Sequence, residues 1–326
     1  MRDAVEMLRK SRRIFAASHI DPDGDAIGSL LGFTWIMRAL GKSVTPAMSD
    51  AVPWRFQDLP GASDIAAAKP SQEHDLLVAL DASELSRVGS VLTAEDLGGR
   101  PLLVIDHHVT NSRFGTANFI DPSAASTAEM VYLLGVELGA PIDNASATCL
   151  LTGVVTDTLG FRTTNTTPRV LEVAQHLMQA GANLPEISRR AFNSQTYASL
   201  CLTAEALHNM QMEDGVVWTE LTQEMLKRLD IGPGDWAGIV GQLASVREAD
   251  AAVVFRERED GRIDISMRSK PGLNLAPVAL SLGGGGHPQA AGATLPPPMS
   301  AVSQRVVGEL KRAVAAHRAE TEGEAA

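Results

Sequence analysis

Acidic and imidazole side chains recur at three points in the first third of the chain, each directly after a short apolar run. The three runs are RIFAAS, DLLVAL and LLVI. The side chains that follow them are His19, Asp23, Asp25, Asp81, Asp106, His107 and His108. Carboxylates gathered this closely would repel one another and raise their own pKa values unless cations neutralise them. Carboxylates and imidazoles without thiolates suit Mn²⁺ or Mg²⁺, so the pattern predicts a metal cluster.

The expected chemistry is displacement at phosphorus. Two metal ions about 3.5–4 Å apart are used for in-line displacement, in which they polarise the phosphoryl oxygens and activate a water. Such a pair needs a bridging carboxylate, and Asp81, alone at the end of its run, is the candidate. Asp157, which follows the apolar segment Ala145–Val155, is a further candidate ligand.

Each acidic residue also has a simpler interpretation. An Asp between a strand and a helix is often only a helix cap, which is the role we assign to Asp21. Asp23-Gly24 fits a plain turn, and a lone Asp81 fits a cap. The recurrence after three successive apolar runs favours the metal cluster over these interpretations.

A parallel sheet would bring these residues together. The apolar runs Arg13–His19, Asp75–Leu80 and Leu102–Ile105 are typical of buried strands. The segments between and after them have helical patterns, namely Ala26–Leu40, Ser126–Leu138, Ala145–Val155 and Pro168–Ala180. This alternation predicts an α/β fold with a doubly wound parallel sheet, whose ligand crevice lies at the carboxyl ends of the strands.

The rest of the chain has a different pattern. Residues 1–185 form the predicted first domain, 186–210 a helical linker, 211–320 a smaller α+β domain, and 321–326 a frayed tail. Within the second domain we expect two strands around a turn at Asp260-Gly261. We also expect helices over Trp236–Val246 and Ser300–Ala319.

Composition limits the partners. The formal net charge of −11 argues against long duplex nucleic acid, because proteins that track a duplex usually carry a basic face. No apolar stretch is long enough to cross a bilayer, and Met1–Arg13 lacks an apolar signal core, so we expect a cytoplasmic protein. Cys149 and Cys201 are expected to be free, buried thiols.

Five segments, in this order along the chain, resemble motifs of the DHH phosphoesterase superfamily. In the first domain they are HIDPDGDAIGS (His19–Ser29), Leu80-Asp81, Asp106-His107-His108 and TGVVTDT (Thr152–Thr158). In the second domain, the run Gly283–Gly286 followed by His287 resembles the GGGH signature of the DHHA1 substrate domain. The resemblance covers nearly the whole chain, and the two-domain length is similar to that of the nanoRNase/pAp phosphatase group.

The resemblance implies a role for each motif residue. One metal ion would be held by His19, Asp23 and Asp81, and the other by Asp25, Asp81, His107 and Asp157. Asp106 would orient His107 through its other ring nitrogen, and His108 would face the scissile phosphate as hydrogen-bond donor or general acid.

A phosphate contact is expected in the second domain. Backbone amides of Gly284, Gly285 and Gly286 can approach a phosphate closely, and His287 lies beside them. Arg268, at the end of a predicted strand, suits bidentate binding of a terminal phosphate. Ser126 and Thr127 would line the crevice from the first domain or, equally, cap a helix.

The predicted function is therefore two-metal hydrolysis of short phosphodiesters. The resemblance implies degradation of RNA oligomers of two to five nucleotides to mononucleotides and conversion of pAp to AMP. Cyclic di-AMP or linear dinucleotide hydrolysis is the alternative within enzymes. A non-catalytic nucleotide sensor or RNA-binding module is the alternative from another class. A homodimer is compatible with the sequence, although no residue pattern establishes it.

Overall fold

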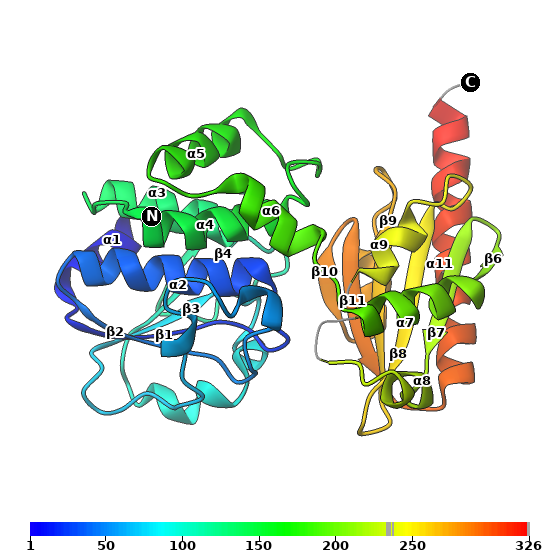
Figure 1. The fold of residues 1–326 in the computed structure, drawn as a ribbon, viewed down its shortest axis with the longest axis horizontal. Coiled ribbons are helices and arrows are strands. Elements are labelled where there is room, and N and C mark those ends of the chain that lie inside the picture. Colours follow the sequence, from blue (N-terminus) through cyan, green and yellow to red (C-terminus); the bar gives the residue numbers. More distant parts are fainter. Residues whose placement is uncertain (233–235, 237, 325–326) are drawn as a thin grey trace. The chain divides into compact units, whose positions relative to one another are not determined.

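The structure, a computed structural model, describes residues 1–232, 236 and 238–324. It consists of two compact units, Met1–Ser194 and Gln195–Ala326, coloured blue to green and green to red in Figure 1. Among the described residues, none of the helices combines the length and the apolar character that crossing a membrane requires.

Five parallel strands form the sheet of the first unit, in the order β2-β1-β3-β4-β5. They are β1 (Arg13–Ala17), β2 (Ser43–Ala47), β3 (Leu76–Leu80), β4 (Leu102–Asp106) and β5 (Ala117–Ile120). This is a doubly wound order with its switch point between β1 and β3. The predicted parallel sheet is confirmed, and it has two edge strands, β2 and β5, beyond the three expected.

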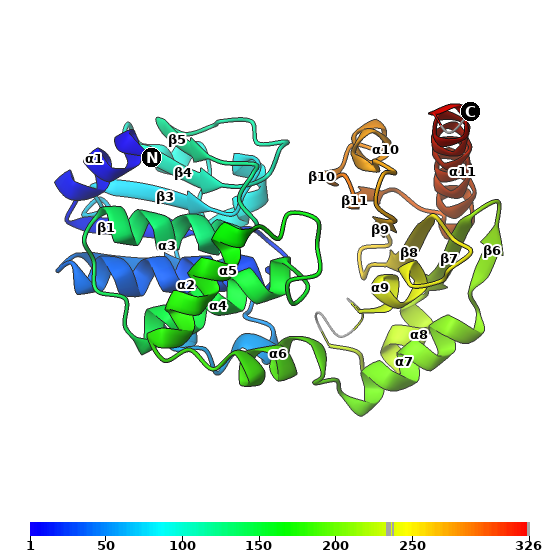
Figure 2. The same ribbon diagram turned by 90° about the horizontal axis from the view of Figure 1, so that it is seen from above.

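Alternation along the strands divides the first core into two faces. Ile14 and Ala16 of β1 lie in one core cluster with Leu30, whereas Phe15 and Ala17 lie in another cluster on the opposite face. The first face is covered by long helices, and Figure 2 shows α2, α3 and α4 together on that side of the sheet. The second face packs against the short 3₁₀ segment Leu85–Val91. The six helices are α1 (Arg2–Lys10), α2 (Gly24–Ala39), α3 (Thr127–Glu137), α4 (Asn144–Asp157), α5 (Pro168–Gln179) and α6 (Leu184–Phe192).

The second unit contains a six-stranded mixed sheet in the order β10-β11-β9-β8-β7-β6. Among the described strands of this sheet, only β7 and β8 pair in parallel. Its strands are β6 (Gln211–Glu213), β7 (Val216–Leu221), β8 (Ala251–Glu257), β9 (Ile263–Ser269), β10 (Gly285–His287) and β11 (Ala290–Leu295). The predicted hairpin is confirmed, because β8 and β9 pair antiparallel around Gly261, whose φ is 81°.

Helices cover both faces of this second sheet. One core joins the sheet to α10 (Ala276–Ser281) and α11 (Met299–Glu324). The other joins it to α7 (Tyr197–His208), α8 (Gln223–Arg228) and α9 (Ile239–Ala244). The α+β character expected for this part of the chain is therefore confirmed.

Four expectations need correction. The single linker helix over 186–210 is two helices, because α6 ends at Phe192 and a new helix, α7, begins at Tyr197. The side chain of Thr196 caps α7 by accepting from the N–H of Ser199. The tail predicted to fray from 321 is helical as far as Glu324, and residues 325–326 lie outside the described residues. Both cysteines are free as expected, but Cys201 is only partly buried. The helix expected over Trp236–Val246 is shorter, and residue 237 lies outside the described residues.

Candidate metal centre

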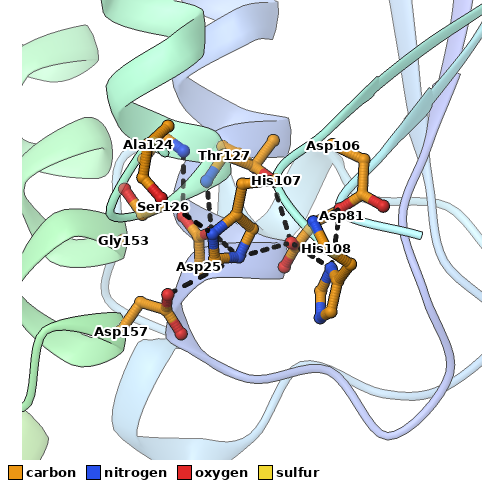
Figure 3. Close-up of polar contacts among 12 residues, drawn as sticks. Asp25, Asp81, Asp106, His107, His108, Ala124, Ser126, Thr127, Gly153 and Asp157 are labelled. Carbon is orange, nitrogen blue, oxygen red and sulfur yellow. Dashed lines mark hydrogen bonds and ion pairs between the residues drawn. The ribbon is translucent and has the colours of Figure 1, made fainter. Parts of the chain in front are cut away.

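The carboxyl ends of three strands converge in the first unit, as the sequence predicts. His19 lies just beyond β1, Asp81 directly follows β3, and His107 directly follows β4. Asp25 comes from the first turn of α2, and Asp157 is the last residue of α4. Figure 3 shows Asp25, Asp81, His107 and Asp157 pointing toward one another. Five elements, β1, α2, β3, β4 and α4, therefore supply one cluster.

A first group of ligand atoms surrounds His19. Its Nε2 lies 3.8 Å from Oδ1 of Asp23 and 3.6 Å from Oδ2 of Asp81. The other ring nitrogen, Nδ1, lies 2.7 Å from the carbonyl oxygen of Ile20, to which it donates. This bond fixes a proton on Nδ1 and turns Nε2 toward the carboxylates, which is the ring orientation that a metal-binding imidazole requires.

A second group surrounds His107. Its Nε2 lies 3.5 Å from Oδ2 of Asp157, 3.9 Å from Oδ2 of Asp25 and 3.7 Å from Oδ1 of Asp81. Its Nδ1 faces the carbonyl oxygen of Ala124 at 3.3 Å. Asp81 thus presents Oδ2 to His19 and Oδ1 to His107, so its two oxygens face the two groups. The potential ligand atoms of His19, Asp23 and Asp81 all lie within 4.8 Å of one another, and so do those of Asp25, His107 and Asp157.

The start of α3 holds two of these carboxylates in place. The backbone N–H groups of Thr127 and Ala128 donate to Asp25 at 2.6 and 3.0 Å, where the positive end of the helix dipole favours an anion. The hydroxyl of Thr127 donates to Oδ1 of Asp81 at 2.9 Å. Ser126 caps the helix by accepting from the N–H of Glu129.

This arrangement corrects the expectation that Ser126 and Thr127 line the crevice. Both residues are fully buried, and both hydroxyls are engaged, one with a helix end and one with Asp81. Neither side chain therefore has surface to offer a substrate. Ser126 takes the helix-cap alternative, and Thr127 supports the carboxylates.

Close packing of α2 against α4 brings Asp25 and Asp157 together. A Cβ on Gly28 would lie 2.5 Å from the carbonyl oxygen of Cys149. A Cβ on Gly153 would lie 2.6 Å from Oδ1 of Asp25. Glycine is therefore required at both positions for the two helices to approach as they do.

The electrostatics of the cluster call for cations. Burial, with the neighbouring charges of Asp81 and Asp157, raises the pKa of Asp25 well above its ordinary value. Burial likewise raises the pKa of Asp157 to about 6. Burial alone would also raise the pKa of Asp81, but contact with His19 and the nearby imidazoles hold it below the ordinary range. Divalent ions would relieve the repulsion that these shifts express, so the donor set fits them.

Asp106 and His108 form a separate pair, which corrects the expectation that Asp106 orients His107. Oδ1 of Asp106 accepts from Nδ1 of His108 at 2.7 Å, whereas His107 is oriented by the backbone carbonyl of Ala124. Burial works to lower the pKa of His108, but the bond to Asp106 and the charge of Asp81 raise it to about 9. His108 therefore carries a proton at neutral pH that it can donate.

The expected phosphate contacts lie in one row of the second sheet. His287 of β10 and Arg268 of β9 both pair with Ala290 of β11, so their side chains project from the same face. A Cβ on Gly284 or Gly286 would lie 2.0 or 2.4 Å from a carbonyl oxygen of β11. Sheet packing alone accounts for those two glycines.

Gly285 differs from its neighbours. A Cβ there would meet no atom of the described residues within 4 Å. Of the three glycines predicted to approach a phosphate, this one has open space beside it, and neither packing nor a positive φ demands a glycine here. Its open side is compatible with the close approach of a ligand to the backbone.

Several residues that support the site were not anticipated. Ala124 contributes only a carbonyl oxygen, and Gly153 only the absence of a side chain. Asn111, whose amide bonds to Asp106 at 2.6 Å, lies three positions after the Asp-His-His motif. The position of Asn111 shortly after the Asp-His-His motif is the one feature of the sequence that could have indicated a supporting residue.

Comparisons with known proteins agree with this geometry. Residues 13–154 match the family model described as DHH family, N-terminal domain, and residues 219–316 match the DHHA1 domain. The chain is 41% identical over 307 residues to the bifunctional oligoribonuclease and PAP phosphatase NrnA of Thermus thermophilus, covering 90% of this chain and 88% of that protein.

More distant relatives extend the picture. A cyclic-di-AMP phosphodiesterase, GdpP of Geobacillus thermodenitrificans, is 28% identical over 86% of this chain, which corresponds to 44% of that protein. An exopolyphosphatase-related protein from Bacteroides fragilis has a similar structure, with a TM-score of 0.84 and 26% identity over 98% of this chain and 97% of that one. With its ordered motifs, its converging carboxylates and a relative of 41% identity, the chain belongs to the DHH phosphoesterase family and carries a DHHA1 domain.

Proposed function

We propose that the chain uses two divalent cations, Mn²⁺ foremost and Mg²⁺ second, to hydrolyse short phosphodiesters. The proposed substrates are RNA oligomers of two to five nucleotides, which yield mononucleotides, and pAp, which yields AMP. The relative of 41% identity is named for these two activities. One cation would be held by His19, Asp23 and Asp81, and the other by Asp25, Asp81, His107 and Asp157.

The observation that carries this proposal is the placement of Asp81. One of its oxygens lies 3.6 Å from the Nε2 of His19, and the other lies 3.7 Å from the Nε2 of His107. A carboxylate that faces two separate ligand groups is suited to bridging two cations. Bound there, the cations would supply Lewis acidity toward the phosphoryl oxygens and a water of lowered pKa.

The protein's own groups would complete the reaction. His108, held by Asp106, would donate a proton to the leaving oxygen. In the second unit, Arg268, His287 and the backbone at Gly285 would bind a phosphate group of the substrate. The preference for short oligomers over long ones follows the name of the 41% identical relative, an oligoribonuclease.

A substrate panel tests the proposal. Purified protein with Mn²⁺ is incubated with pAp, a diadenosine dinucleotide, a long RNA oligomer and cyclic di-AMP, and Asp81→Ala serves as the inactive control. We expect fast hydrolysis of pAp and the dinucleotide, slow hydrolysis of the long oligomer, and loss of all activity in Asp81→Ala. Equal rates on the long oligomer and the dinucleotide would exclude selection by length.

Two alternatives are separated by the same panel. The relative named as a cyclic-di-AMP phosphodiesterase favours cyclic di-AMP or linear dinucleotides as the second candidate class of substrate, and faster turnover of cyclic di-AMP than of pAp would establish it. A wild-type protein that binds these ligands but hydrolyses none with any metal would be a nucleotide sensor or RNA-binding module. The homodimer and the cytoplasmic location stay predictions from the sequence.

A further inference from the structure

Asn111 ties together the ends of two strands that carry the site. Its side-chain amide donates to Oδ2 of Asp106 at 2.6 Å and to the carbonyl oxygen of Ala82 at 3.0 Å. Asp106 ends β4, and Ala82 is the residue after Asp81 at the end of β3. One side chain therefore fixes the spacing between the expected bridging carboxylate and the Asp106–His108 pair.

The two oxygens of Asp106 have different partners. Oδ2 accepts from Asn111, and Oδ1 accepts from Nδ1 of His108 at 2.7 Å and from its backbone N–H at 3.3 Å. Asp106 is fully buried, so these protein donors take the place of solvent around it. The direction in which Oδ1 points, and with it the imidazole of His108, therefore depends on the bond that holds Oδ2.

The loop that carries Asn111 is itself fixed against the neighbouring loop. The N–H of Asn111 donates to the carbonyl oxygen of His108 at 3.2 Å, and the N–H of Ser112 donates to that of Ser83 at 2.8 Å. The side-chain oxygen of Asn111 accepts from the N–H of Arg113 at 2.7 Å. Both ends of the Asn111 amide are thus engaged, which orients its donor group toward Asp106.

We infer that Asn111 is a positioning residue, which acts on the reaction through Asp106 and His108. The inference rests on the proposed function, in which His108 serves the leaving group. In that step water adds to phosphorus, the ester P–O bond breaks, and the leaving oxygen takes a proton from His108. The proton lost by the water restores the imidazole, so protons balance over the turnover.

A comparison of two leaving groups tests the inference. In a dinucleotide the leaving group is a ribose oxygen, which must take up a proton as it departs. In the p-nitrophenyl ester of a nucleoside monophosphate the leaving group is p-nitrophenolate, a stable anion that needs no proton. We expect Asn111→Ala to lower kcat about 10–100-fold on the dinucleotide, the usual effect of losing a group that orients a site residue. On the p-nitrophenyl ester we expect a loss of less than about 3-fold, and KM should change little on either substrate.

A double-mutant cycle shows whether the effect passes through His108. The effects of mutations on kcat are not additive when the residues act as a unit. In a His108→Ala background, Asn111→Ala should therefore lower kcat on the dinucleotide by less than about 3-fold. A full, additive loss in that background would overturn the inference, and so would an equal loss of kcat on both leaving groups. A wild type that hydrolyses neither substrate would instead overturn the proposed function, which keeps the two failures apart.

Two further variants control for folding. Asn118→Ala removes from β5 a side-chain amide that bonds to the backbone of Gly115, just before that strand. We expect kcat within about 2-fold of wild type because no site residue depends on this amide. If thermal unfolding shows that Asn111→Ala is unfolded at the assay temperature, Asn111→Asp replaces it. That variant keeps the size of the side chain but sets an oxygen against Oδ2 of Asp106. It should give the same leaving-group pattern, and a loss independent of the leaving group would overturn the inference.

Discussion

The hydroxyl of Thr127 donates a 2.9 Å hydrogen bond to Oδ1 of Asp81, the same oxygen that faces the Nε2 of His107. The first turn of α3 therefore orients the carboxylate on which both ligand groups depend. Since the backbone N–H of Thr127 also holds Asp25, this one residue links a helix end to two carboxylates of the centre.

Thr127→Val should weaken metal binding while leaving the fold intact. Valine keeps the shape of the side chain and the backbone bond to Asp25 but removes the donor to Asp81. We expect about 10–100-fold weaker Mn²⁺ binding by calorimetry and a loss of stability of about 1 kcal/mol. Thr34→Val is the matched control, because its buried hydroxyl bonds only to Leu30 within α2. Equal Mn²⁺ affinities of the Thr127→Val variant and wild type would contradict this role.

Gly153→Ala should damage both stability and metal binding. The added methyl group would lie 2.6 Å from Oδ1 of Asp25 and 2.6 Å from Cβ of Ala128, and overpacking of this kind costs about 1–3 kcal/mol. Gly308→Ala in α11 is the control, because the nearest atom to its Cβ, from Arg312, lies 3.9 Å away. That change should stabilise the protein by about 0.5–1 kcal/mol, as Gly to Ala does in a helix interior. Chemical denaturation measures the change in the free energy of unfolding for both variants.

Arg169 should contribute more to stability than an equally exposed arginine elsewhere. It donates to Glu129 at 2.6 Å, and its side chain is 41% exposed while that of Glu129 is 0% exposed. Arg190 is 39% exposed, but its partner Glu186 is 38% exposed. We expect Arg169→Met to cost about 1–3 kcal/mol, because it removes a partner from a buried charge. Arg190→Met should cost about 0–1 kcal/mol. Similar losses in the two variants would show that burial of Glu129 does not matter.

Metal affinity should rise with pH. The pKa of Asp157 is raised to about 6 from 3.8, so its carboxylate is disfavoured in the metal-free fold. The stability that this group contributes is present below pH 3.8 and is lost as the pH rises toward 6. A metal ion needs the deprotonated ligand, so binding releases protons at and below this pKa and tightens as the pH increases.

Calorimetry in two buffers of different ionisation enthalpy measures that proton release. We expect the apparent Kd for Mn²⁺ to fall by roughly tenfold per pH unit for each proton released, and to level off once the ligands are ionised. Asp157→Asn should bind more weakly and lose the part of the pH dependence that Asp157 supplies. An affinity that is constant between pH 5 and pH 8 would rule out protonated ligands in the metal-free protein.

The sequence placed His19, Asp81 and His107 in one cluster because each follows an apolar run that is typical of a buried strand. The sequence did not predict the two edge strands, β2 and β5. β2 contains Pro46, which an edge position tolerates, and every residue of β5 is only partly buried. The sequence also did not identify His108 as the partner of Asp106, because loop geometry decides which of the two adjacent histidines faces Asp106. Contacts that use a backbone carbonyl, as at Ala124, leave no pattern in the side chains.

The central claim is that Asp81 bridges two metal ions. Crystals grown with Mn²⁺ and measured at the manganese absorption edge give the number and the position of the ions directly. The account predicts two anomalous peaks in the first unit, one beside His19 and one beside His107, each next to a different oxygen of Asp81, and the loss of at least one peak in Asp81→Ala. A single peak, or two peaks that persist unchanged in Asp81→Ala, would contradict it.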